Sequence, residues 1–288
     1  MTVIIGSAVV VVCVLGGYLL HGGPFGVLLQ WNEFLIIGGA ALGSLLVGSP
    51  LPVLKQMAGR LTGLLRGDPY TQSVYLDLMG TLYQLFITAK RDGLISLESH
   101  VEDPPKSAIF SKNPFILHNH HALHFLCDTL KLLLTGSVPP HDLEGLLDVD
   151  LETHHRTSAT TSGLVQKLGD ALPGLGIVAA VLGIVITMQA VDGKPEEIGH
   201  KVAAALVGTF LGIFLSYGYI QPLATNLEFQ AAAEGRFLHC IKNCLVAFAR
   251  GAPPLVAVEV ARHVMFSDDR PEPEALAEAC RTAGKRAA

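Results

Sequence analysis

Four stretches of the chain are apolar over the length that a helix needs to cross a lipid bilayer, about 20 residues. They run from Thr2 to Leu20, from Phe34 to Leu51, from Ala171 to Val191 and from Val202 to Leu223. The first contains no charged residue, and Glu33 immediately precedes the second. The pattern therefore predicts four transmembrane helices.

The segments outside these stretches show helical rather than strand periodicity. Helices are expected at Gln72–Lys90, Ile116–Leu134 and His141–Val149, at Ser162–Gly169 leading into the third stretch, and at Asn226–Ala249 continuing the fourth. Pro104-Pro105 break the chain between the first and second of these helices, and Gly136 with Pro139-Pro140 ends the second. The tail from Asp268 onward is polar, and we expect it to be partly disordered at its end.

This pattern predicts an all-α membrane protein with four transmembrane helices and a helical cytoplasmic domain. Residues 1–51 would hold the first two transmembrane helices and residues 52–168 the cytoplasmic domain. Residues 169–225 would hold the third and fourth transmembrane helices, and residues 226–288 a cytoplasmic C-terminal helix and tail.

Composition agrees with a membrane location. Half of the residues, 50%, are hydrophobic and 16% are charged, whereas soluble domains carry about 25% charged residues. The net charge of −5 gives no electrostatic support to nucleic-acid binding. The first apolar stretch lacks a basic leading region and a small-residue cleavage site, so we expect it to be retained rather than removed as a signal peptide.

The basic residues near the ends of the stretches predict the orientation. Lys55, Arg60 and Lys167 flank the long segment between the second and third stretches. The connection at 21–27 has no Lys or Arg, and the one between the third and fourth stretches has only Lys194. Because basic residues close to membrane spans favour the cytoplasm, both termini and the long segment should be cytoplasmic in an inner-membrane protein.

The histidines and cysteines outside the membrane are candidate metal ligands. His118, His120, His121 and His124 crowd one helix, and His120 and His124 have metal-ligand spacing. No carboxylate nearby completes the motif, so we favour surface or interhelical histidines here, as for His154 and His155. Cys240 and Cys244 are interpreted as buried free thiols. We expect no metal, no cofactor and no enzymatic activity, because no nucleophile, base and metal come together.

Small residues follow one side of the third and fourth stretches. They are Gly176, Ala180 and Gly183 in the third, and Ala204, Gly208, Gly212 and Ser216 in the fourth. Such stripes let membrane helices approach closely, because lipid provides no hydrophobic drive for association. Plain packing of a helix bundle also explains them.

The third and fourth stretches contain hydroxyl groups but no carboxylate or basic side chain. The hydroxyls are those of Thr187, Thr209, Ser216, Tyr217 and Tyr219. They can line a wet path but do not titrate near neutral pH, and proton relays in membranes use ionisable side chains. If this chain serves proton flow, the titrating acid must therefore come from another protein. Glu33, at the membrane edge, suggests an outer-side interfacial role.

Two prolines, Pro173 and Pro222, lie at the expected cytoplasmic ends of the third and fourth stretches. Proline removes a backbone donor and bends a helix. The pair could act as a hinge between the membrane and the cytoplasmic domain, or each could simply mark a helix entry or kink.

Several stretches together resemble the MotA flagellar stator proteins of the MotA/TolQ/ExbB proton channel family. They read GLISLE at 93–98, LPGLGIVAAVLG at 172–183, VGTFLGI at 207–213 and PLA at 222–224. The resemblance extends from 16–18 to 253–254 and 270–271, which is nearly the whole chain.

The resemblance implies a stator subunit that couples proton flow across the bacterial inner membrane to torque on the rotor, in swimming motility and chemotaxis. It implies a homo-oligomeric ring around a MotB-type single-span, peptidoglycan-anchored subunit that supplies the membrane Asp, and contact with a FliG-type rotor protein through the cytoplasmic domain.

The same resemblance assigns roles to individual residues. Lys90, Arg91 and Glu98 match the rotor-contact charges, although the sequence leaves open which of the two basic residues meets the rotor. Pro173 and Pro222 match the coupling prolines. Ala180 and Thr209, with Thr187 and Tyr217, would line the proton path. Sodium-driven relatives tend to have hydroxyls at both positions that here hold Ala180 and Thr209, so the coupling ion is expected to be H⁺ rather than Na⁺.

Two alternatives remain at this point. A TolQ- or ExbB-type energiser shares the two spans of the proton path but has three spans in all, which four predicted spans argue against. A membrane scaffold whose cytoplasmic domain only binds partners would conduct no ions.

Overall fold

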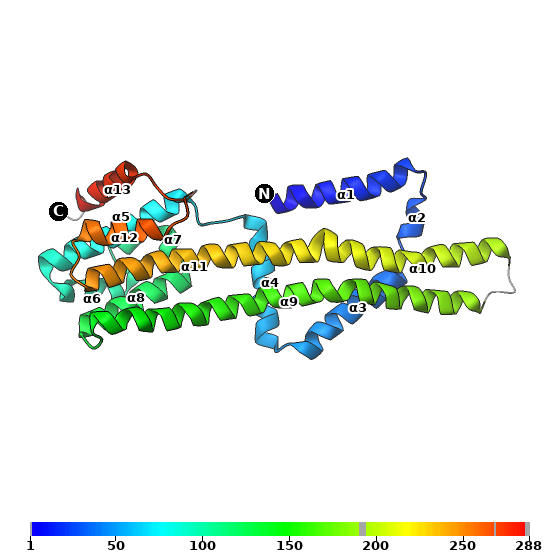
Figure 1. The fold of residues 1–288 in the computed structure, drawn as a ribbon, viewed down its shortest axis with the longest axis horizontal. Coiled ribbons are helices and arrows are strands. Elements are labelled where there is room, and N and C mark those ends of the chain that lie inside the picture. Colours follow the sequence, from blue (N-terminus) through cyan, green and yellow to red (C-terminus); the bar gives the residue numbers. More distant parts are fainter. Residues whose placement is uncertain (1, 190–193, 268, 286–288) are drawn as a thin grey trace. The chain divides into compact units, whose positions relative to one another are not determined.

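The computed structural model describes residues 2–189, 194–267 and 269–285, and for Arg66 the backbone alone. Within these ranges the chain is almost entirely helical and contains no strand (Figure 1). It divides into two compact units. The first unit comprises Met1–Gly67 and Thr157–Gln230, and the second comprises Asp68–Arg156 and Ala231–Ala288. The all-α fold predicted from the sequence is confirmed.

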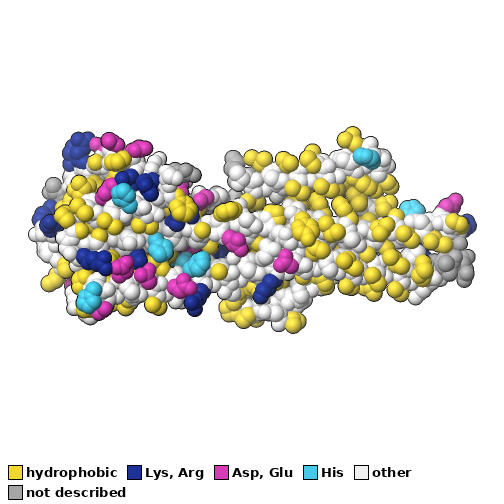
Figure 2. Space-filling model, viewed as in Figure 1, with side chains coloured by type: hydrophobic (Ala, Val, Ile, Leu, Met, Phe, Trp, Pro, Cys, Tyr) yellow, Lys and Arg dark blue, Asp and Glu magenta, His cyan; other side chains and the backbone are white. Residues whose placement is uncertain are grey.

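The first unit contains the apolar helices. They are α1 (Thr2–Leu20), α3 (Trp31–Gly48), the second half of α9 (Pro140–Met188) and α10 (Pro195–Leu215), with the short α2 (Phe25–Leu28) before α3. Within the described residues, 4 helical stretches are long and apolar enough to cross a membrane. Many of their apolar side chains are exposed, as lipid contact requires, and Figure 2 shows them covering this unit on the face in view.

The ends of the second predicted span are corrected. The second span begins earlier, at Trp31, and ends at Gly48 rather than Leu51. It ends there because Pro50 disfavours helical backbone at the preceding residue, and Ser49 is extended, with φ −146 and ψ 139. Leu51 instead opens α4 (Leu51–Gly63), which runs into η1 (Leu64–Arg66). The predicted end of the third span at Val191 lies outside the described residues.

The fourth apolar helix is interrupted by a π turn. Helix α10 passes through η5 (Ser216–Ile220) into α11 (Gln221–Ala249), so the helix continues beyond the membrane-spanning stretch as the sequence predicted. The backbone N–H of Gln221 bonds the carbonyl of Ser216, five residues back. Pro222 is the next residue, and it has no backbone N–H to donate to a helical carbonyl. The π turn therefore lies directly before a residue that cannot continue the regular bonding pattern.

Two apolar clusters pack the first unit. Ile37 and Ala41 of α3 meet Leu172 and Ala179 of α9 and Leu211 of α10. The second cluster joins α4 and η1 to α9 and α11 through Met57, Leu64, Val165, Ala224 and Leu227. These contacts hold α9 and α10 together with α3 against them, which is the arrangement that positions the candidate site.

The second unit has one large core. Its longer helices are α5 (Gln72–Asp92), α8 (His120–Thr135), the start of α9, the end of α11, α12 (Pro254–Val264) and α13 (Pro273–Lys285). Short elements lie between α5 and α8: η2 (Leu94–Leu97), α6 (Glu98–Glu102), η3 (Pro104–Lys106), η4 (Phe110–Lys112) and α7 (Pro114–His118). Tyr75, Phe86 and Phe237 are among its fully buried side chains, and Phe86 stacks on Phe248 with ring centroids 4.1 Å apart.

The helices predicted in this unit need two changes. The stretch Ile116–Leu134 forms two helices, because the side chain of Asn119 accepts the backbone N–H of Ala122 and begins a new helix there. The helix predicted at His141–Val149 is only the start of the longer α9, whereas Ser162–Gly169, which lies in the first unit, leads into the third span within this same helix, as predicted.

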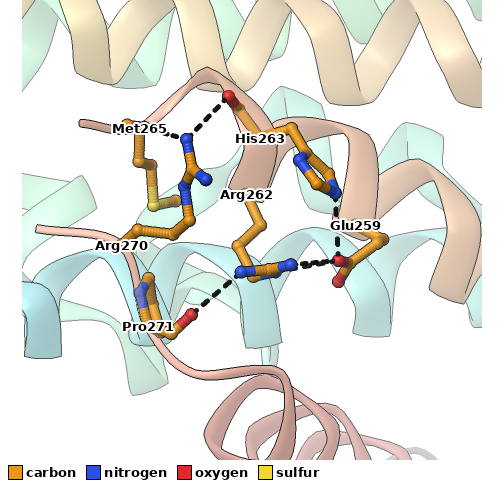
Figure 3. Close-up of polar contacts among 6 residues, drawn as sticks. All are labelled: Glu259, Arg262, His263, Met265, Arg270 and Pro271. Carbon is orange, nitrogen blue, oxygen red and sulfur yellow. Dashed lines mark hydrogen bonds and ion pairs between the residues drawn. The ribbon is translucent and has the colours of Figure 1, made fainter. Parts of the chain in front are cut away.

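The polar tail contains a hydrogen-bonded segment and a helix. Arg262 bonds Glu259 and donates to the carbonyl of Pro271 at 3.2 Å, and Arg270 donates to the carbonyl of Met265 at 2.9 Å (Figure 3). These bonds fold the segment after α12 back on itself and precede α13. Helix α13 packs on α5, where a Cβ on Gly80 would lie 3.7 Å from that of Ala283. The disorder expected at the very end concerns 286–288, which lie outside the described residues.

Candidate functional site: the seam between α9 and α10

Helices α9 and α10 approach each other closely along the predicted small-residue stripes. A Cβ on Gly176 would stand 2.7 Å from the carbonyl oxygen of Gly208, and one on Gly212 would stand 2.5 Å from that of Leu172. Real Cβ atoms do not come this near to a neighbour, so these positions require glycine. The stripes are therefore a helix–helix seam, as their spacing predicted.

The seam extends in both directions from these glycines. A Cβ on Gly183 would lie 2.7 Å from the Cβ of Ala205, so Ala205 rather than the expected Ala204 makes this contact. Toward the other end, the buried hydroxyl of Ser216 donates a 2.7 Å hydrogen bond to the carbonyl of Gly169.

The bond from Ser216 compensates for Pro173. In a regular helix the carbonyl of Gly169 would accept the backbone N–H of residue 173, but proline has none. Pro173 lies inside α9 and is half-buried. A hydroxyl from the π turn after α10 thus satisfies the acceptor that the proline of α9 leaves open.

A polar clasp lies at the same level. Asp170 Oδ1 accepts hydrogen bonds from Gln166 Nε2 at 2.8 Å and from Gln221 Nε2 at 3.1 Å. Gln221 immediately precedes the exposed Pro222. The clasp therefore joins α9 to α11 close to both prolines, of which Pro173 is half-buried and Pro222 is exposed.

Glu33 is placed differently from the expectation of a membrane-edge, interfacial acid. It lies within the first turn of α3, and its residue is 7% exposed. Its Oε2 has no hydrogen-bond partner within the described part of the chain, and a Cβ on Gly208 would overlap it. The sequence alone shows no carboxylate in the third and fourth spans, but the second span brings one against their seam.

The residues expected to line the proton path do not all lie together. Ala180 is buried beside Gly208, whose added Cβ would be 3.2 Å from Ala180 N, and Thr209 follows Gly208 and is half-buried. The buried Thr187 donates to the carbonyl of Gly183 at 2.8 Å, within its own helix.

Tyr217 lies elsewhere. Its residue is 62% exposed, and with Pro222 it lines a pocket of about 300 Å³ against α1 residues such as Ser7 and Val10. Tyr219 donates to the carbonyl of Ser7 at 3.3 Å. The structure therefore separates Tyr217 from the seam that holds Ala180 and Gly208.

The three candidate rotor-contact charges belong to the second unit and are all exposed. Arg91 binds the neighbouring Asp92, with Nη2 and Oδ2 2.9 Å apart, and this guanidinium holds the pKa of Asp92 below its usual value. Lys90, the residue before it, makes no ion pair within the described residues, and neither does Glu98 at the start of α6. The two neighbouring basic residues thus differ, because Arg91 is held in an ion pair within the described residues and Lys90 is not.

The cysteines of the second unit are buried free thiols, as expected for Cys240 and Cys244. Burial raises the pKa of Cys240 to about 12, and those of Cys127 and Cys280 to about 11. Thiols with pKa values this high are not thiolates near neutral pH, so these cysteines are poor nucleophiles.

Comparison with protein families matches both parts of the chain. Residues 4–93 match the family described as motility protein A N-terminal. Residues 118–234 match the MotA/TolQ/ExbB proton channel family.

Full-length relatives are also similar. Motility protein A of Salmonella typhimurium is 38% identical over 271 residues, covering 94% of this chain and 92% of that protein. Chemotaxis protein LafT of Vibrio parahaemolyticus is 40% identical, covering 93% and 94%.

Two solved structures share the fold. MotAB of C. jejuni has a TM-score of 0.78 at 20% identity, covering 94% of this chain and 98% of that chain. The flagellar MotAB stator complex of Bacillus subtilis has a TM-score of 0.75 at 21% identity, covering 93% and 96%.

Proposed function

Because this chain belongs to the motility protein A family, we infer that it is a stator subunit of a bacterial flagellar motor, which couples proton flow across the inner membrane to torque on the rotor. The observation that carries this conclusion is similarity over nearly the full length, including both the membrane helices and the second unit. The chain is a multi-pass inner-membrane protein with 4 candidate spans among its described residues.

The partner that fits the seam is a MotB-type single-span subunit that supplies a membrane aspartate. The spans of α9 and α10 carry no carboxylate or basic side chain between Ala171 and Met188 or between Val202 and Leu215. Proton relays need such groups. The similar structures are MotAB complexes, and we propose the same assembly here: a ring of this chain around MotB-type subunits.

The chemistry of the seam suits a titrating group that another protein supplies. A neutral carboxylic acid can move along a wall of glycine and alanine, whereas its charged form is costly there. Protonation from the outer side would permit the movement, and release to the cytoplasm would reverse it. Each proton that crosses the potential releases about 2.3 kcal/mol per 100 mV. No enzymatic reaction is proposed for the chain.

We propose H⁺ rather than Na⁺ as the coupling ion. Sodium is held by several oxygen ligands, and Ala180 offers no side-chain oxygen at its place beside Gly208. Thr209 provides one hydroxyl, but the hydroxyl of Thr187 already donates within its own helix. A proton needs no such set of oxygen ligands, because it is carried on the partner's carboxylate.

For contact with a FliG-type rotor protein we propose Lys90 and Glu98. Both are exposed and make no ion pair within the described residues, whereas Arg91 is bound to Asp92. Charges at the rim of an interface suit a contact that forms and breaks rapidly. Pro173 and Pro222 remain the proposed coupling positions, with Pro173 acting at the seam through the Ser216 bond.

The test is functional replacement. Expression of this chain with its MotB-type partner in a bacterium that lacks stators should restore swimming. Membrane vesicles containing both proteins should take up protons, and vesicles with this chain alone should not. Proton uptake by the chain alone would remove the need for a partner acid, and uptake without any motility would favour the TolQ/ExbB-type alternative.

A further inference from the structure

Three side chains from three helices of the second unit come together, and none of them belongs to the proposed ion path or rotor contact. They are His121 of α8, His154 of α9 and Glu234 of α11. One nitrogen from each histidine and one carboxylate oxygen lie within 4.8 Å of one another. The rings of His121 and His154 meet edge to face, with centroids 4.9 Å apart. We propose that these three side chains bind one Zn²⁺ ion.

The spacing fits a tetrahedral metal. Zinc binds histidine nitrogen and carboxylate oxygen at about 2.0–2.2 Å, so two ligand atoms of a tetrahedron stand about 3.3 Å apart. Nε2 of His154 and Oε1 of Glu234 are 3.3 Å apart. The nitrogen of His121 lies within 4.8 Å of both atoms, and His121 is exposed, so a rotation of its side chain can adjust the position of that nitrogen.

One ligand atom is buried without a hydrogen bond. Nε2 of His154 has no hydrogen-bond partner within the described residues, although it faces Glu234. The side chains of His154 and Glu234 are only 14% and 16% exposed. A buried imidazole nitrogen without a partner loses its bond to water, and a metal ion would satisfy it together with the carboxylate.

The surroundings supply space and negative charge. The histidines open onto a pocket of about 300 Å³, which Asp128 and Asp150 also line. Two neutral histidines and one carboxylate leave a net positive charge on a Zn²⁺ site, which the neighbouring aspartates partly offset. Three protein ligands leave the fourth position for water. The pair His120 and His124, which the sequence singled out by its spacing, lies at the pocket but outside the group of three.

A bound ion would tie α8 to α9 and α11. Helix α8 otherwise joins these helices through the apolar core. Because the unfolded chain lacks the site, metal binding would add directly to the stability of this unit. The proposal does not depend on the stator function, because it concerns ligands and packing within the second unit alone.

The experiment uses the full chain purified with its MotB-type partner and Zn²⁺ alone as the probe. After chelation, titration calorimetry should show one Zn²⁺ site per copy of this chain, and Zn²⁺ should raise the temperature of thermal unfolding. Co²⁺ in place of Zn²⁺ should give the strong visible absorption of a tetrahedral site. The variants are His121→Ala, whose exposed position keeps the fold, His154→Ala and Glu234→Gln.

Each of these variants should weaken Zn²⁺ binding by more than about tenfold. Removing a group that only hydrogen-bonds a metal ligand already has an effect of this size, and these variants remove the ligands themselves. His120→Ala is the matched control and should leave binding unchanged. Loss of binding in His120→Ala with retention in His154→Ala would assign the metal to the i, i+4 pair and overturn the proposal. No saturable Zn²⁺ binding, or equal binding by all variants, would leave His154 and Glu234 as an ordinary ion pair.

Discussion

The hydroxyl of Ser216 donates a 2.7 Å hydrogen bond to the carbonyl of Gly169 across the seam between two membrane helices. That carbonyl is the one that Pro173 leaves without a helical donor. Pro173 in one helix is thus tied to the π turn of the next. The bond explains how Pro173 is tolerated inside a continuous helix, and it makes the two residues energetically dependent on each other.

Ser216→Ala should destabilise the complex, because a buried carbonyl without a partner costs about 1–3 kcal/mol. Pro173→Ala restores the backbone donor, so the double variant should lose less stability than the two single variants together. Thermal unfolding of the purified complex measures this. Thr187→Ala is the control, because its hydroxyl bonds a carbonyl that already has a helical donor. Additive effects of Ser216→Ala and Pro173→Ala would show that the two positions are independent.

Gly208→Val should abolish swimming, whereas Gly199→Ala, at a glycine with open space around it, should not. A side chain at 208 would overlap Glu33 and come within 3.2 Å of Ala179 and Ala180, so α3, α9 and α10 could not keep their spacing. Gly199→Ala in the same helix is the control, since nothing lies within 4 Å of its added Cβ. Swimming speed and the amount of protein in the membrane are measured together. Normal swimming by Gly208→Val would mean that the seam opens without loss of function.

Much of this arrangement follows from the sequence, and its limits have physical causes. Apolar length predicts the four spans, and spacing every four residues predicts the seam glycines, because both are local patterns. The bond from Ser216 to Gly169 joins residues that are far apart in the chain. The role of Ser216 could therefore be seen only once the helices were placed.

Other misses also arise from tertiary contacts or from single capping residues. Glu33 reads as a flanking charge in the sequence and becomes buried only because α3 packs on α10. His121, His154 and Glu234 come from three helices, so no local motif contains them. Asn119 divided one predicted helix in two by capping the second, a signal that was present in the sequence but outweighed by the apolar periodicity on either side.

Glu33→Gln should retain most of the swimming of the wild type. The carboxyl is buried against Gly208, and its Oε2 has no hydrogen-bond partner within the described residues. A neutral amide of the same size fills this place. Glu33→Lys should abolish swimming, because it brings a cation to the seam where charge is costly. Swimming assays with both variants, at equal membrane abundance, test the pair. If Glu33→Gln stops the motor as completely as Glu33→Lys, the charge of this acid takes part in ion transfer.

Reversing the charge at Lys90 should reduce torque more than reversing it at Arg91. Lys90 is free to meet a partner, whereas the guanidinium of Arg91 is bound to Asp92 and faces a different direction on α5, since neighbouring helix positions differ by about 100 degrees. The variants Lys90→Glu and Arg91→Glu are matched in charge change and exposure, so each controls for the other. Torque is measured from the rotation of tethered cells, and a reversed acidic charge on the rotor should partly rescue Lys90→Glu. Rescue of Arg91→Glu instead would place Arg91 at the interface and show that its bond to Asp92 breaks there.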